Sequence, residues 1–256
     1  MYLRQIDSKT VIREFSSIGE MVSFLDTSPA NGKYERQSET NSRDFTQTNS
    51  YKEAMELLLR GWTEAADKMT RTLKTLPQPA PAKRQKSVYS VAGHTASVPR
   101  YLQGVPTNMI ASVPDRRKQP VVVINHAIAY SGWWKAENIL KEGIKALQVV
   151  QAIEASNRNV KLNIVCISED RGYKRGFKVC IKQPGERLNI SKMAFPLAHP
   201  SMLRRMFFKY MEVEPEMPIR FYGYGTPCNE DCPKFYPDEM YIPERVDTEK
   251  IFSQIS

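Results

Sequence analysis

Two short apolar runs on either side of a long amphipathic segment constrain the fold of this 256-residue chain more than any other feature. Val121 to Ile124 and Leu162 to Ile167 are rich in β-branched residues, which is typical of strands covered on both faces. Between them, residues 134–156 carry apolar side chains at helical spacing. A strand, a helix and a second strand in this order predict a right-handed βαβ crossover with two parallel strands.

The remaining segments extend this unit into one integrated α/β domain. We expect a mainly parallel sheet flanked by helices, in a Rossmann-like or von Willebrand A-like order, with an N-terminal helical extension. Residues 1–76 should supply strands and an amphipathic helix, 77–120 a Pro-rich basic connector packed on the core, and 121–256 the α/β core with an acidic C-terminal segment.

Local patterns predict the individual elements. Ser50 and Glu53 fit a capping box at the start of one helix that runs to about Leu73. The other expectations are strands at 2–6, 10–15, 87–91, 177–181 and 219–224, helices at 18–25, 191–213 and 248–255, and a long loop at 28–49.

Positive charge is concentrated in the middle of the chain. The chain carries 37 Lys and Arg against 28 Asp and Glu, and hydrophobic residues make up 41%. This composition excludes collagen-like, coiled-coil and wholly disordered chains, and no apolar run is long enough to cross a bilayer. Residues 76–120 carry seven basic residues and one acidic residue, whereas residues 212–256 carry four basic and ten acidic residues.

The basic clusters and neighbouring aromatic residues favour nucleic acid as a partner. Phosphates attract Lys and Arg, and bases of a single strand stack on exposed rings. The expected phosphate contacts are Arg116, Arg117, Lys118, Arg171, Lys174 and Arg175, with Trp133, Trp134 and Tyr173 as stacking platforms. Further basic residues are Lys83, Arg84 and Lys86, Lys178, and Arg204 with Arg205. The alternative is a set of ordinary solvated surfaces, neutralised in part by the acidic C-terminal segment.

A crevice outside the carboxyl ends of the parallel strands is a second candidate site. We expect Asn125, His126, Tyr130 and Ser131 to line it, together with the two tryptophans. The order of elements resembles a von Willebrand A-like domain, which binds a divalent cation through an Asp-x-Ser-x-Ser motif. The corresponding residues here are Asn125, Ala127 and Ala129, so the resemblance implies that this metal site is absent.

The cysteines and histidines give no clear catalytic or metal motif. Cys228 and Cys232 have a spacing that could serve two zinc ligands, but no second Cys or His pair lies nearby, so zinc, a disulfide and free thiols stay open. His126 follows a predicted strand without a nucleophile or carboxylate partner in a recognisable motif. His199 should pack between helical segments. We therefore expect no cofactor, no metal and no catalytic residue.

Three stretches carry a resemblance to a known family: residues 50–62, 98–109 and 197–205. They resemble a family of tailed-bacteriophage proteins of unknown function, over roughly residues 45–245. The Cys228 and Cys232 pair is not part of that pattern. The resemblance implies a viral protein in the cytoplasm of a phage-infected bacterium, and the virion is the second expected location. No membrane partner is expected, because no apolar run is long enough to cross a bilayer.

Together these patterns predict a non-enzymatic, phage-encoded accessory protein. It would bind single-stranded DNA or a nucleoprotein complex during replication or transcription, since no motif that reads a duplex is visible. A virion or assembly component is the alternative. A third hypothesis is an enzyme that uses the crevice near Asn125 and His126.

Overall fold

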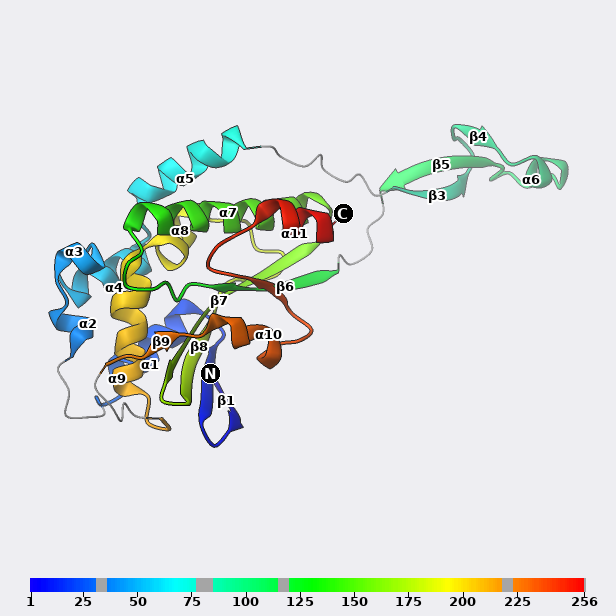
Figure 1. Cartoon of the computed structure of the whole chain (residues 1–256). Coiled ribbons are helices and arrows are strands. Elements are labelled where there is room, and N and C mark those ends of the chain that lie inside the picture. The colour runs from blue at the N-terminus through cyan, green and yellow to red at the C-terminus, as the bar shows by residue number, and fades with distance from the viewer. Residues whose placement is uncertain (31–35, 77–84, 115–119, 218–222, 256) are drawn as a thin grey trace.

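The computed structural model describes residues 1–30, 36–76, 85–114, 120–217 and 223–255. Within these residues the chain forms an α/β body around a large mixed sheet and a smaller, separate sheet (Figure 1). The body contains the βαβ unit that the apolar pattern predicts. No helix among the described residues has both the length and the apolar character that a membrane span requires.

The large sheet contains seven strands among the described residues. Its order is β1 (Tyr2–Asp7), β2 (Thr10–Phe15), β8 (Tyr173–Lys182), β7 (Asn159–Asp170), β6 (Val121–Ala127) and β10 (Met240–Ile242), with β9 (Thr226–Pro227) paired to β7. The pairs β10 with β6, β6 with β7, and β2 with β8 are parallel, and the other pairs are antiparallel. The expected α/β class is confirmed, and the sheet is mixed.

The crossover from β6 to β7 passes through the longest helix, α7 (Ala136–Ala155). Val121 pairs with Asn159 and Ala127 with Val165, so the two apolar runs lie side by side and parallel, as predicted. A turn at Arg171 and Gly172 then reverses the chain into β8. The φ angles are positive, 50° at Arg171 and 81° at Gly172. Glycine adopts positive φ easily because it has no Cβ.

Helices supply the cover for this sheet. The longer ones are α1 (Ile18–Thr27), α4 (Tyr51–Arg60), α5 (Thr63–Thr75), α8 (Ile190–Ala198), a π-helix η1 (Met202–Phe207), α9 (Phe208–Val213) and α11 (Thr248–Ile255). The shorter ones are α2 (Gln37–Thr40), α3 (Arg43–Thr46), α6 (Val98–Leu102), the 3-10 helix η2 (Asn229–Asp231) and α10 (Cys232–Phe235).

Alternate side chains of β7 enter two different cores. Ile164 and Cys166 belong to the larger core, which the helices α1, α4, α5, α7, α8 and α9 complete. Val165 and Ile167 belong to a smaller core on the other face. The strand is therefore buried on both faces, which explains its continuous apolar sequence.

The single helix expected from Ser50 to Leu73 is two helices, α4 and α5. The Ser50 hydroxyl accepts a hydrogen bond from the backbone N–H of Glu53 at 3.1 Å, so the predicted cap is present. Gly61 ends α4 with φ 96°, and a Cβ there would lie 2.8 Å from the Ser191 hydroxyl. The close approach to Ser191 requires glycine and bends the chain, which apolar spacing alone does not indicate.

The expected long loop at 28–49 is also only partly a loop. Its described part forms α2 and α3, and Ser38, Thr46 and Thr48 are buried there. The reason is Arg205, whose fully buried guanidinium donates hydrogen bonds to this segment. The segment is polar in sequence because it supplies acceptors to a buried cation.

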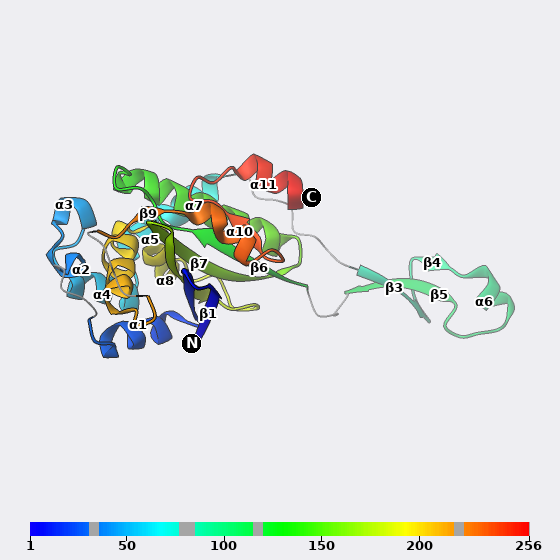
Figure 2. The ribbon, with the colours of Figure 1, turned by 60° about the horizontal axis from the view of Figure 1, so that its bottom comes forward.

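Residues 85–114 do not pack on the core as the expected connector. They form the smaller sheet from β3 (Gln85–Ser90), β4 (Thr95–Ala96) and β5 (Met109–Pro114), with α6 between β4 and β5. We call residues 85–114 the arm. Figures 1 and 2 both show it projecting from the body. Segments 77–84 and 115–119 of the predicted connector, and 219–222 of a predicted strand, lie outside the described residues.

Candidate functional site

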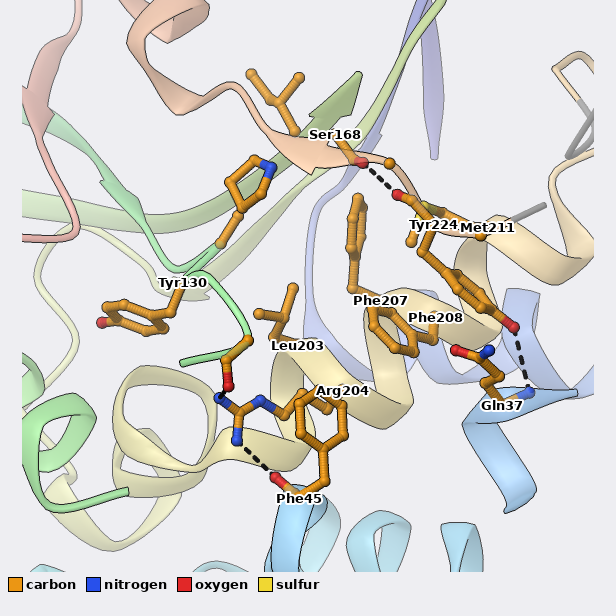
Figure 3. A pocket seen from close by; sticks show the side chains of 16 residues that line it. Gln37, Phe45, Tyr130, Ser168, Leu203, Arg204, Phe207, Phe208, Met211 and Tyr224 are labelled. Carbon is orange, nitrogen blue, oxygen red and sulfur yellow. Dashed lines mark hydrogen bonds between the residues drawn. The ribbon is translucent and has the colours of Figure 1, made fainter. Parts of the chain in front are cut away.

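A cavity of about 260 Å³ lies beside the carboxyl ends of β6 and β7 (Figure 3). This is the edge of the sheet where open α/β folds usually bind ligands. Its wall is largely apolar and aromatic, formed by Phe45, Leu203, Phe207, Phe208, Met211 and Tyr224. A cavity lies at the edge of the sheet where a crevice is expected, but of the residues expected to line that crevice Tyr130 alone is part of the cavity lining.

The π-helix and α9 supply one wall of the cavity. Two pairs of adjacent residues, about one helical turn apart, line this wall: Leu203 with Arg204, and Phe207 with Phe208. A π-helix has more residues per turn than an α-helix, so residues four and five apart can share one face. Phe207 and Phe208 follow Arg204 by three and four residues, a spacing that places side chains on one side of an α-helix as well.

The opposite end is built from β7 and the segment that follows Gly223. The Ser168 hydroxyl donates a hydrogen bond to the Tyr224 carbonyl. The Tyr224 hydroxyl donates to Glu212 at 2.6 Å, and burial and this carboxylate both raise the Tyr224 pKa. Its ring stacks on Phe208 at 4.1 Å. Tyr224 is thus fixed as a rigid aromatic wall.

Arg204 places a buried positive charge at the other end of the cavity. Its side chain donates to the backbone carbonyls of Phe45 at 2.6 Å and Trp134 at 2.8 Å, and more weakly to Gly132 at 3.3 Å. Its guanidinium also lies 4.2 Å from the centre of the Phe45 ring. Burial lowers the Arg204 pKa from its ordinary value.

The predicted crevice residues have other positions. The Asn125 amide donates to Glu239 at 2.6 Å and accepts from Asn163 at 3.0 Å, within the sheet. His126 is fully buried, its Nδ1 lies 3.4 Å from the Ile242 carbonyl, and burial lowers its pKa to about 4.

Only Tyr130 of the predicted crevice residues lines the cavity, and its ring points away from it, toward Trp134. Ser131 instead lines a shallower depression with Trp133 and Trp134. In that depression, Arg245 lies 5.4 Å from the Trp134 ring.

The fold neutralises most of the basic cluster on β8. Arg175 is only 3% exposed, so it cannot serve as the expected phosphate contact. Lys174 forms ion pairs with Asp231 and, at 3.7 Å, with Glu169. Lys178 is buried and pairs with Glu239 at 2.5 Å. The acidic C-terminal segment therefore neutralises β8, as the alternative interpretation anticipates.

The other expected contacts differ in accessibility. Arg171 is exposed at the β7–β8 turn, and Tyr173 is half-buried with Lys9 5.9 Å from its ring. Trp133 is 94% exposed, whereas Trp134 packs against Tyr130. Arg116, Arg117 and Lys118 lie outside the described residues, as do Lys83 and Arg84.

The arm presents a second candidate surface. Tyr89 is 54% and Tyr101 67% exposed, and none of residues 85–113 is buried. The Arg100 guanidinium lies 4.2 Å from the centre of the Tyr89 ring and donates to the Thr107 carbonyl at 2.9 Å. Arg100 therefore joins α6, the following loop and β3, and keeps Tyr89 in place.

The cysteines act as core residues. All four are free and buried, and Cys228 and Cys232 pack with Ile12 and Val165 in the smaller core. Burial raises the pKa of each of these two thiols to about 12. No group of three or more potential metal ligands occurs among the described residues.

The sequence patterns did not predict that Arg204 lines the cavity. The signal was the sequence Met-Leu-Arg-Arg-Met-Phe-Phe at 202–208, in which two arginines interrupt an apolar helix. Charged residues with apolar neighbours on both sides are candidates for burial, and buried arginines need a dedicated set of acceptors. Net charge alone counted Arg204 and Arg205 as surface residues.

Comparison with protein families matches residues 4–254 to a family described as a domain of unknown function, DUF7192. The chain belongs to this family. The matched region includes the arm, the cavity and the large sheet. No curated protein matches the chain, and no solved structure does either.

Proposed function

We propose that the protein is a non-enzymatic nucleic-acid-binding protein that contacts single-stranded DNA or a nucleoprotein complex through the arm. The observation that carries the proposal is the combination of exposed aromatic rings and uniform charge sign in one projecting element. Tyr89 and Tyr101 are exposed on the arm, and its charged residues are the basic Lys86 and Arg100. Single-strand binding sites combine the same two features.

The charge pattern around the arm supports this proposal. No acidic residue occurs between Asp67 and Asp115, and this interval contains seven lysines and arginines. The clusters at 83–86 and 116–118 flank the arm in sequence. A polyanion approaching the arm would therefore meet cations without the neutralising carboxylates that accompany β8.

The packing of the arm also indicates that it needs a partner. A small sheet is only marginally stable in water unless it has an apolar face or a packing neighbour. The arm contains no buried side chain among residues 85–113. Binding that covers Tyr89 and Tyr101 would supply the missing contacts.

A fluorescence-anisotropy titration of labelled single-stranded DNA with the full chain tests the proposal. We expect binding at about 50 mM salt that weakens strongly at about 200 mM, because phosphate contacts release counterions. Tyr101→Ala should lower the affinity by about 5- to 100-fold if one base stacks on the ring. Lys86→Gln should reduce the salt dependence.

Two variants on the body test the competing surface, because the sequence predicts Trp133 and Arg171 as nucleic-acid contacts. Trp133→Ala removes a 94% exposed ring outside the arm, and Arg171→Gln removes an exposed cation at the β7–β8 turn. The proposal predicts little change for both. If these two variants lose affinity while the arm variants retain it, the binding surface is on the body and the proposal is wrong.

A virion or assembly component is the second candidate, favoured by one observation. Val91, Val98 and Leu102 are exposed apolar residues on the arm, which suit a protein partner. In that case the chain should not bind oligonucleotides at low salt, and particles should contain it. Light scattering of the purified chain and mass spectrometry of particles separate the two candidates.

The phage origin, the host-cytoplasm location and the finer fold comparison also stay proposals. The order β6, α7, β7, antiparallel β8, helices and β10 supports a von Willebrand A-like arrangement, to which β2 and β1 are added beyond β8. Residues 50–62, 98–109 and 197–205 support the tailed-phage origin by their resemblance.

A further inference from the structure

We propose that the cavity beside β6 and β7 binds a small organic anion with an apolar body, and that Arg204 is its anion-binding group. Carboxylates and phosphate monoesters share this chemistry. The site is separate from the arm, so it can be present whether or not the arm binds nucleic acid.

Arg204 is a buried cation without a counter-ion among the described residues. It is 4% exposed, and its hydrogen bonds within the described residues go to backbone carbonyl oxygens only. Its Nε is buried and has no hydrogen-bond partner in the described part of the chain. Buried charges in folded proteins are normally paired, so an unpaired one that lines a cavity indicates an anionic ligand.

Two other buried arginines show that this arrangement is unusual in this protein. Arg13 forms a bidentate pair with Glu214, with distances of 2.7 and 2.6 Å. Arg205, next to Arg204 in sequence, donates from Nε and from both terminal nitrogens to Thr48, Ser38 and Asn41, among others. A fourth buried arginine, Arg175, also has one buried nitrogen, Nη1, without a hydrogen-bond partner among the described residues, but it does not line the cavity. Arg204 is the buried arginine that combines such a nitrogen with a place in the cavity lining.

The cavity wall determines the rest of the ligand. In Figure 3, Leu203, Phe207 and Phe208 lie between Arg204 and Tyr224, so an apolar group can extend from the cation toward Tyr224. A volume of about 260 Å³ lies just below the ~300 Å³ at which ligand pockets of folded proteins usually begin. The ligand is thus small, with one anionic end.

Isothermal titration calorimetry with three probes on the full chain tests this proposal. Hydrocinnamate supplies a carboxylate, phenyl phosphate supplies a phosphate, and hydrocinnamyl alcohol is the neutral counterpart of the first. We expect at least one anion to bind about 10- to 100-fold more tightly than the alcohol, because a hydrogen bond to a charged group is lost with the neutral probe. Which anion binds better identifies the class of ligand.

Two variants tie the binding to the cavity. Arg204→Met should remove the preference for the anion, and Leu203→Trp should block the cavity while it keeps the cation. Lys192→Met removes an exposed cation on α8 and should leave binding unchanged. Circular dichroism checks that each variant is folded, and Leu203→Trp keeps the test valid if Arg204→Met unfolds.

Three results would overturn the proposal. The first is equal affinity for the alcohol and both anions, and the second is no binding of either anion at millimolar concentration. The third is unchanged anion binding in folded Leu203→Trp. None of these variants changes the arm, so the result of the DNA-binding test with arm variants does not decide whether the cavity binds an anion. Likewise, failure of anion binding in the cavity does not decide whether the arm binds DNA.

Discussion

Replacement of Arg205 by methionine should destabilise the protein more than any surface change. Arg205 is fully buried and donates hydrogen bonds to the carbonyl oxygens of Ser38, Asn41 and Thr48 and to the hydroxyls of Thr46 and Thr48. Methionine fills similar space but leaves the carbonyl oxygens of Ser38 and Asn41 without a donor, whereas the acceptor atoms of Thr46 and Thr48 keep other hydrogen bonds. Each unsatisfied buried acceptor costs about 1–3 kcal/mol, offset in part because a desolvated charge is also removed.

We expect Arg205→Met to lower the free energy of unfolding by about 4 kcal/mol, a large share of the 5–15 kcal/mol typical of folded proteins. With a urea m-value of about 3 kcal/mol/M, the midpoint of unfolding should fall by about 1.3 M. Hydrogen exchange should accelerate first in α2 and α3, which Arg205 holds to the π-helix.

The matched control is Arg43→Met, which removes an exposed arginine from α3 in the same region. It should change the free energy of unfolding by less than about 0.5 kcal/mol. If the two variants unfold at the same urea concentration, the hydrogen bonds of Arg205 contribute nothing net and the explanation of the 36–48 segment is wrong.

Three further predictions concern single groups. Burial lowers the pKa values of His126 and His199 to about 4, below the unfolded value of about 6.5. The free energy of unfolding should therefore fall as the pH drops from about 6.5 to 4, because the unfolded chain binds protons that the folded chain does not. An NMR titration that shows ordinary pKa values for these two histidines would contradict this. In urea unfolding, Gly225→Ala should lower the free energy of unfolding by about 1–3 kcal/mol more than Gly185→Ala does. Both glycines have positive φ, but of the two only Gly225 is so close to β7 that a Cβ would lie 2.3 Å from a carbonyl oxygen of that strand. Finally, a thiol reagent should react with Cys228 only after denaturant is added, because its thiol is buried and its pKa is about 12; rapid labelling of the native chain would refute the packing.

The sequence predicts the βαβ centre well because its signals are local. Val121 to Ile124 and Leu162 to Ile167 are short, β-branched and separated by a helix of the right length, which leaves few alternatives. The capping serine at position 50 was equally readable.

Local sequence patterns do not predict which charged side chains form ion pairs in the folded protein. Lys174 and Lys178 look like a basic surface in sequence, yet Asp231 and Glu239, about 60 residues away, neutralise them. Long-range pairing of this kind depends on the fold, and net charge per segment carries no information about it.

The sequence predicts a crevice at the carboxyl ends of the parallel strands, but it does not predict the residues that line the cavity found there. The carboxyl ends of β6 and β7 gave its position, whereas its walls come from the π-helix and from Tyr224. Arg204 and Phe207 are three residues apart and share a face in an ordinary α-helix too, but helical spacing does not say whether that face borders a cavity or the core.

Photo-crosslinking of single-stranded DNA to the full chain, followed by mass spectrometry of the linked peptides, tests the central claim most directly. Aromatic side chains stacked on bases are well placed to crosslink, so the peptides that contain Tyr89 and Tyr101 should carry the nucleotide, and excess unlabelled DNA should compete. Crosslinks confined to the peptides around Trp133 or Tyr173, or none at low salt, would contradict the account.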